Sequence, residues 1–114
     1  MPHFILDCSE DVFERHQRSS VMRVVFQLAE ASGLFDVGDI KVRLRPCRDY
    51  LTAGSREPFV HVFAYIMEGR TIEQKQALSA AIVSGLKELF PDVPTVSMNV
   101  MDFERATYHN RNTV

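Results

Sequence analysis

The clearest structural pattern of the chain lies in residues 59 to 71, which read Phe59-Val60-His61-Val62-Phe63-Ala64-Tyr65-Ile66-Met67-Glu68-Gly69-Arg70-Thr71. In an extended chain, successive side chains point to opposite sides. Over residues 59–67 this alternation places aromatic, histidine and methionine side chains on one side and aliphatic side chains on the other. Neither side is suited to free water, so the pattern predicts a strand that needs cover on both faces.

A helix and a further strand are predicted after this stretch. Thr71 and Gln74 fit a capping box, which marks the start of a helix. Apolar side chains then recur at helical spacing until Pro91, which predicts a helix over residues 72–90. Residues 95–101 alternate between apolar and polar side chains, so we expect a strand with one apolar face toward the helices.

The first half of the chain shows the same order of elements. Residues 2–8 are apolar enough for a strand, and residues 20–32 carry a helical apolar stripe. From residue 39 the period changes to two, which predicts a strand over residues 39–45 that Pro46 closes. Residues 12–19 fit either a helical turn or a loop.

The two halves, residues 2–46 and 58–101, are strand-helix-strand units of one domain that spans residues 1–114. Each unit requires a right-handed crossover between parallel strands. Joined side by side, they predict an α+β two-layer sandwich, a four-stranded mixed sheet with both helices on one face. The other sheet face then lacks cover, so we expect self-association. Residues 102–114 form a C-terminal segment that either reaches a neighbouring subunit or frays.

The composition narrows the class of protein. A net charge of -2, with 25% charged and 46% hydrophobic residues, is typical of a soluble globular protein without an overall attraction to nucleic acid or membranes. No signal peptide or membrane-spanning run is recognised, so we expect a cytoplasmic protein. Cys8 and Cys47 have no metal-binding or redox spacing, and the four histidines lack short ligand spacing, so no metal site is expected.

Two cationic features are candidates for anion binding. Lys41, Arg43 and Arg45 share one side of a predicted strand. Arg70 directly precedes the second predicted helix, whose first backbone N–H groups favour anions. Carboxylates are the obvious ligands for such groups, although a solvated strand edge and a surface arginine explain the same residues.

Pro2 is the candidate catalytic residue. Removal of Met1 turns its nitrogen into a chain-terminal secondary amine, and an α-amino group has a reference pKa of about 7.7 to 8.0. Apolar surroundings and nearby cations lower such a pKa, which makes the amine available as a base. With Met1 in place the same nitrogen is a tertiary amide without basicity. A small residue at position 2 also simply permits removal of the initiator methionine.

These features together resemble a known family. The chain carries four short motifs in the order Met1-Pro2-His3-Phe4-Ile5, Phe59-Val60-His61-Val62, Gly69-Arg70-Thr71 and Glu73-Gln74-Lys75. In this combination it resembles the tautomerase superfamily and, within it, the 5-carboxymethyl-2-hydroxymuconate isomerases. The resemblance implies the two-layer fold of macrophage-migration-inhibitory-factor-like proteins, assembled as a homotrimer. It also implies cofactor-free isomerisation of an unsaturated 2-hydroxy acid to its 2-oxo form, in the breakdown of homoprotocatechuate.

The resemblance assigns roles to individual residues. It implies that Pro2 is the base and that Arg70 matches a substrate-binding arginine of the family. A second arginine of the family falls on the second strand, where this chain has Lys41, with Arg43 two residues later on the same side. Two other interpretations stay open: a trimeric anion-binding protein without catalysis, and a tautomerase that acts on another enol.

Overall fold

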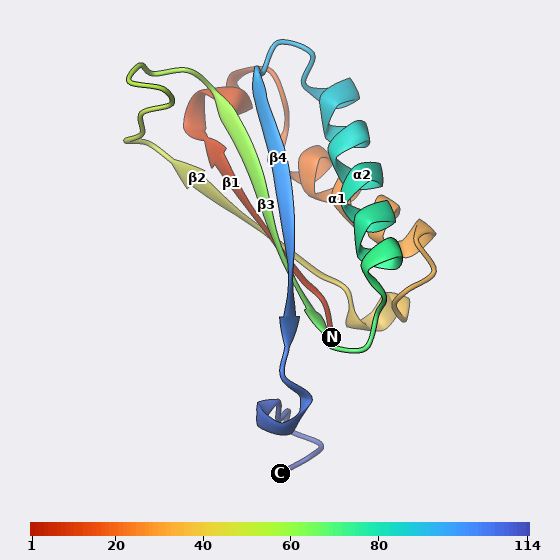
Figure 1. The fold of residues 1–114 in the computed structure, drawn as a ribbon. Helices are drawn as coiled ribbons and strands as arrows, with labels where there is room; N and C mark the ends of the chain where they lie inside the picture. Colours follow the sequence, from red (N-terminus) through yellow and green to blue (C-terminus); the bar gives the residue numbers. More distant parts are fainter.

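The computed structural model describes all residues from Met1 to Val114 (Figure 1). Its elements follow one another along the chain as β1 (His3–Ser9), a 3-10 helix η1 (Glu10–Glu14), α1 (Arg18–Ala31), η2 (Val37–Asp39), β2 (Lys41–Cys47), β3 (Phe59–Met67), α2 (Ile72–Leu89), β4 (Thr95–Phe103) and η3 (Arg105–Thr107). No helix is both long enough and apolar enough to cross a membrane.

The four strands form one mixed sheet in the order β2-β1-β3-β4. β1 is parallel to β2 and β3 is parallel to β4, while the central pair β1 and β3 is antiparallel. Both helices lie on the same side of this sheet (Figure 1). The predicted fold, two β-α-β units in a two-layer sandwich, is confirmed.

The core lies between the sheet and the two helices. Phe4 of β1 and Val62 of β3 are fully buried, because alternate residues of both central strands point toward the helices. Val25 of α1 and Ile82 of α2 meet them there as parts of one hydrophobic cluster. The predicted capping box is present at the start of α2, where Thr71 accepts from the Gln74 backbone N–H.

Several predicted boundaries were wrong by a few residues. Pro46 does not close the second strand but lies inside β2, which is possible because β2 is an edge strand and needs no donor at that position. β4 continues to Phe103, so the C-terminal segment begins inside a strand. Residues 10–14 form η1, and α1 begins at Arg18 instead of residue 20.

The sheet face opposite the helices carries half-buried aromatic and polar side chains. His61 of β3 is held between two side chains of β4, with Nδ1 2.7 Å from Ser97 Oγ and Nε2 2.7 Å from Asn99 Oδ1. Phe63 and Tyr65 lie on the same face and remain half-buried. Met67, which we expected to need cover there, is already buried within the chain, at 8% exposure.

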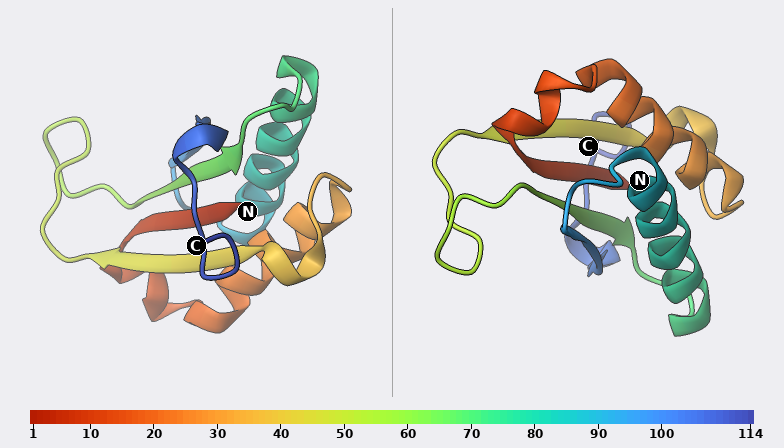
Figure 2. Two further views of the ribbon diagram at one scale, coloured as in Figure 1. Left: turned by 90° about the horizontal axis from the view of Figure 1, so that it is seen from below. Right: turned by 90° about the horizontal axis from the view of Figure 1, so that it is seen from above.

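The sheet topology brings several segments of the chain to one edge. Because β1 and β2 are parallel, both begin at the same edge of the sheet. β3 is antiparallel to β1, so β3 and its parallel neighbour β4 end at that edge. The chain start, the β3–α2 turn and the C-terminal segment therefore meet there, as the view from below shows (Figure 2).

Candidate active site

Three sequence-predicted residues come together at this sheet edge. Pro2 directly precedes β1, and its carbonyl oxygen accepts a hydrogen bond from the Lys41 backbone N–H at 3.2 Å. Lys41 begins β2 and is paired with His3 in the parallel ladder. Arg70 lies in the turn between β3 and α2. Residues far apart in the sequence thus meet because two strands begin and one strand ends at the same place.

The side chain of Pro2 is fully buried. The pKa of the Met1 amine is lowered, first by burial and then by the charges of Arg70 and Lys41, against opposing contributions from Asp39 and Asp36. The Pro2 nitrogen is one residue away, within about 3.8 Å along the backbone. The surroundings that disfavour an ammonium group at Met1 are therefore also those of an amine at Pro2.

Arg70 is held by uncharged partners. Its guanidinium donates from Nη1 to the Met67 carbonyl oxygen at 3.2 Å and from Nη2 to the Leu34 carbonyl oxygen at 2.6 Å. It also lies over the ring of Phe35, 5.2 Å from the centroid. These contacts fix the half-buried side chain and leave its charge uncompensated.

Lys41 points back toward the chain start. Its Nζ lies 2.8 Å from the Met1 sulfur and 2.8 Å from the Asp39 carbonyl oxygen. One of these two partners disappears when Met1 is removed. The ammonium group then keeps its hydrogen bond to Asp39 and has donors left for a ligand next to Pro2.

Arg43 and Arg45 follow on the same face of β2 but have different partners. Arg45 forms an ion pair with Asp7, with Nε 2.6 Å from Oδ1 and Nη2 3.2 Å from Oδ2. Arg43 instead contacts His3, with Nη1 2.9 Å from Nδ1. The pKa of His3 is lowered by burial and then by Arg43, Lys41 and the chain-terminal amine. Arg45 is therefore neutralised, whereas Arg43 keeps its charge.

An aromatic cluster borders these cations, and its place at the site was not predicted. Phe103, at the end of β4, packs edge-on against His3 with ring centroids 5.8 Å apart. It also stacks on Tyr65 at 6.0 Å and meets Tyr108 of the C-terminal segment at 6.1 Å. The register of β3 against β1 pairs Tyr65 with His3, which is the signal that connects this cluster to the chain start.

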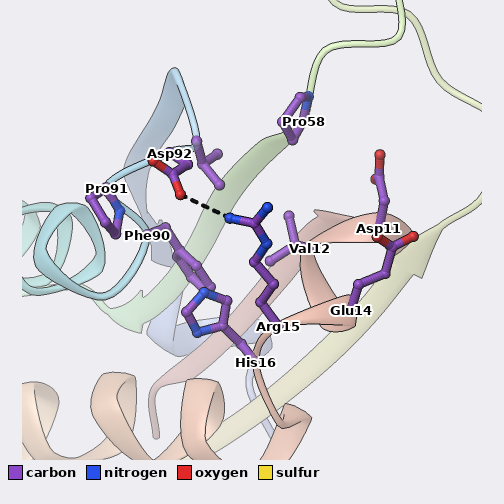
Figure 3. A pocket seen from close by; sticks show the side chains of 10 residues that line it. Asp11, Val12, Glu14, Arg15, His16, Pro58, Phe90, Pro91 and Asp92 are labelled. Atoms are coloured by element: carbon purple, nitrogen blue, oxygen red, sulfur yellow. Dashed lines mark hydrogen bonds and ion pairs between the residues drawn. The ribbon is translucent and has the colours of Figure 1, made fainter.

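A separate pocket lies away from the predicted site residues. A pocket of about 250 Å³ opens at the opposite edge of the sheet, near the end of β1 and the start of β3 (Figure 3). Arg15 crosses it to form an ion pair with Asp92 at 3.1 Å, and His16 packs edge-on against Phe90. No group of three or more His, Cys, Asp or Glu side chains is placed to hold a metal ion. This pocket contains none of the predicted site residues.

The arrangement at the Pro2 edge suits a small anionic molecule. The three ion pairs of the chain use Arg15, Arg45 and Lys75, so Lys41, Arg43 and Arg70 have no carboxylate partner. Such cations bind carboxylates by charge-assisted hydrogen bonds, and arginine does so through a planar, bidentate fork. The aromatic rings of Tyr65 and Phe103 offer an apolar border to a conjugated chain.

Comparisons with known proteins identify the family of the chain. The model of the family "5-carboxymethyl-2-hydroxymuconate isomerase" matches residues 2–114. A 5-carboxymethyl-2-hydroxymuconate Delta-isomerase of Escherichia coli is 24% identical over 111 residues, which covers 96% of this chain and 88% of the relative.

Solved structures show the same fold. The crystal structure of a 5-carboxymethyl-2-hydroxymuconate isomerase from Deinococcus radiodurans R1 superposes with a TM-score of 0.84 at 23% identity, covering 96% of this chain and 88% of that one. A fused 4-OT wild type symmetric trimer superposes with a TM-score of 0.83 at 16% identity, covering 98% and 95%. With a family model that spans nearly every residue and a shared two-layer fold, the chain belongs to the 5-carboxymethyl-2-hydroxymuconate isomerase family and is a tautomerase-type isomerase.

Proposed function

We propose that this protein converts an unsaturated 2-hydroxy acid into its 2-oxo form without a cofactor, with Pro2 as the base after removal of Met1. The substrate is 5-carboxymethyl-2-hydroxymuconate or a related dienol from homoprotocatechuate breakdown. One observation carries the proposal: Pro2 lies at the same sheet edge as Lys41, Arg43 and Arg70, none of which has a carboxylate partner. The E. coli relative is named for the same chemistry.

The surroundings of Pro2 support its role as a base. An amine acts as a base only in its neutral form, and burial together with nearby positive charges disfavours protonation. Arg70 and Lys41 both lower the pKa of the Met1 amine, and the Pro2 nitrogen is the next backbone nitrogen along the chain. The residues that bind the substrate carboxylates therefore also activate the base.

The isomerisation needs one proton transfer through Pro2. The neutral nitrogen removes the proton of the 2-hydroxyl group, and the electron pair of that O–H bond forms the 2-oxo group. The double bonds shift along the conjugated chain, and the new ammonium returns the proton to a carbon atom further along, so one C–H bond replaces one O–H bond. Arg70, with Arg43 or Lys41, holds the carboxylates and stabilises the negative charge that develops.

We also propose that the working form is a homotrimer. The sheet face opposite the helices carries half-buried aromatic side chains, among them Phe63 and Tyr65, which a neighbouring subunit would cover. The fused 4-OT structures with the same fold are trimers.

Two forms of the same chain test the function. One sample keeps Met1 and the other is treated with methionine aminopeptidase, and mass spectrometry verifies both. Ketonisation of a 2-hydroxymuconate-type dienol is then followed by ultraviolet absorbance. Turnover only in the processed form is the expected result, because Met1 makes the Pro2 nitrogen an amide.

A second function is favoured if the processed form lacks turnover. The Met1 sulfur already contacts Lys41 at 2.8 Å, which is compatible with a chain that keeps Met1 and binds anions without catalysis. Calorimetric titration with a dicarboxylate detects such binding. Binding without turnover in both forms would identify an anion-binding protein without catalysis, and sedimentation of the same samples would show whether it is a trimer.

A further inference from the structure

The contact between His3 and Arg43 is the feature that the proposed mechanism leaves unused. Arg43 Nη1 lies 2.9 Å from His3 Nδ1, across the two parallel strands that begin at the site. In the ladder, His3 is paired with Lys41 and Arg43 with Ile5, so His3 and Arg43 are diagonal neighbours on the open sheet face. Long side chains bridge such diagonal positions.

The chemistry of the two side chains fixes the direction of this hydrogen bond. Arginine has five N–H donors, no acceptor and a permanent charge. His3 Nδ1 must therefore accept, which requires a neutral imidazole with its proton on Nε2.

The groups that face His3 favour this neutral form. β2 contributes Lys41 and Arg43, β3 contributes the phenol of Tyr65, and the chain-terminal amine lies near. The ring of Phe103 packs edge-on against the imidazole. The nearest acidic residue on its own strand face, Asp7, is occupied by Arg45. No carboxylate is therefore available to stabilise an imidazolium, in agreement with the lowered pKa of His3.

A neutral partner gives Arg43 a property that Arg45 lacks. Asp7 holds Arg45 and cancels its charge, whereas His3 holds Arg43 and leaves the charge in place. Arg43 is exposed, so an imidazole that restrains it reduces the conformational entropy that a carboxylate ligand would otherwise have to remove. Lys41 is held differently: its contact with Met1 is lost on processing, and its other contact, a hydrogen bond to the Asp39 carbonyl oxygen at 2.8 Å, ties the ammonium to the segment before β2. Lysine also offers a single point charge where arginine offers a bidentate fork to a carboxylate.

From this geometry we propose that His3 is a positioning residue, whose neutral imidazole orients Arg43 as the second carboxylate-binding group of the site. The proposal rests on the proposed function above. In this proposal Arg43, and not Lys41, is the residue of β2 that binds a substrate carboxylate. His3 holds the side chain of Arg43 in place. His3 itself does not touch the substrate in this assignment.

Nuclear magnetic resonance of the histidine side chains tests the contact independently of activity. In the processed protein we expect His3 to be the Nε2–H tautomer with a pKa below the reference value of about 6.5. In Arg43→Ala the pKa of His3 is expected to rise, because a nearby positive charge has been removed. An Nδ1–H tautomer, or a His3 titration that Arg43→Ala leaves unchanged, would overturn the proposal.

Kinetics test the positioning role. His3→Phe keeps a ring beside Phe103 but removes the acceptor, and we expect KM for a dicarboxylate dienol to rise about tenfold with kcat nearly unchanged. His3→Asn places a carbonyl oxygen near the position of Nδ1 and is expected to restore KM to within about threefold. In the Arg43→Ala background, His3→Phe should have no further effect on KM.

A matched control comes from the opposite edge of the sheet. His16 also packs edge-on against a phenylalanine, Phe90, so His16→Phe makes the same substitution away from the site and should leave KM unchanged. Two results would refute the positioning role alone, provided that the wild-type protein is active. One is a KM that His3→Phe leaves unchanged, and the other is a full effect of His3→Phe on KM when Arg43 is already alanine. Processed wild-type protein without turnover instead refutes the proposed function, and with it the assignment of Arg43 to a substrate carboxylate.

Discussion

Arg70 donates a hydrogen bond to the Leu34 carbonyl oxygen at 2.6 Å and so ties the β3–α2 turn to the segment that follows α1. A second donation, to the Met67 carbonyl oxygen at 3.2 Å, fixes the guanidinium from its own side of the turn. Neither partner carries a net charge. The residue thus serves the fold through its hydrogen bonds and remains available to an anion through its charge.

The first prediction concerns this double role. Arg70→Ala should lower the free energy of unfolding by about 1 to 3 kcal/mol, because two carbonyl oxygens lose a charged donor. It should also raise KM for a dicarboxylate dienol more than for a monocarboxylate one, since one carboxylate loses its partner. Urea unfolding and steady-state kinetics measure the two effects. A loss of stability with equal changes of KM for both substrates would make Arg70 purely structural.

The second prediction concerns Pro2. Pro2→Ala leaves a primary amine in nearly the same place, and kcat should fall by about 100-fold or more, the usual contribution of a general base. Because the Pro2 ring is buried, we also expect a loss of stability of about 1 kcal/mol. Stopped-flow or steady-state turnover of the processed protein gives kcat, and calorimetric unfolding gives the stability. Full activity in Pro2→Ala would contradict the assignment of the base.

The third prediction is the pH dependence of the same step. The pKa of the Met1 amine is lowered from 8.0, first by burial and then by Arg70 and Lys41 against the opposing charge of Asp39, and we expect the same direction for a Pro2 amine freed one residue further on. A base is active when deprotonated, so kcat/KM should rise with pH through a pKa below 8 and level off above it. In Arg70→Lys, which keeps the charge, this ascending limb should stay in place, whereas in Arg70→Ala it should move to higher pH. An identical limb in both variants would show that Arg70 does not act on the base.

Some of this site follows from the sequence and some does not. The alternation in residues 39–45 correctly placed Lys41, Arg43 and Arg45 on one side of a strand, because side-chain direction depends only on the local period. Which of them is neutralised depends on the register of β1 against β2, which sets Asp7 opposite Arg45. A single sequence does not specify that register, so the distinction between Arg43 and Arg45 became visible only in the structure.

The partners of Arg70 illustrate a different limit. Its place before α2 was predicted from the capping box, and carboxylates were the ligands expected for its charge. The structure supplies backbone oxygens of Leu34 and Met67 and the ring of Phe35 instead. The contacts with Leu34 and Phe35 join the two halves of the chain. A local sequence pattern does not predict contacts between segments so far apart. For His3 the sequence excluded only metal binding. Its contact with Arg43 depends on the neighbouring strand β2 in the same way.

The fourth prediction uses Arg45 as the control for Arg43. Arg43→Ala should raise KM for a dicarboxylate dienol about tenfold or more, because its charge has no carboxylate partner in the free protein. Arg45→Ala removes the same side chain two residues away, but its charge is already matched by Asp7, so KM should change by less than about twofold. Equal effects of the two substitutions would mean that the charge of the whole β2 face, and not a particular arginine, attracts the substrate.

The fifth prediction concerns the open sheet face. Phe63 lies there half-buried, with the centroid of its ring 4.4 Å from that of His61. If three copies of the chain cover one another's sheets, Phe63→Asp places a charge in an apolar contact and should convert the trimer into monomers. Ala80→Asp adds the same charge on the exposed side of α2 and should leave the trimer intact. Sedimentation velocity measures the oligomeric state, and circular dichroism verifies that both variants are folded. A wild-type protein that sediments as a monomer at every concentration, or dissociation by Ala80→Asp alone, would place the subunit contact elsewhere.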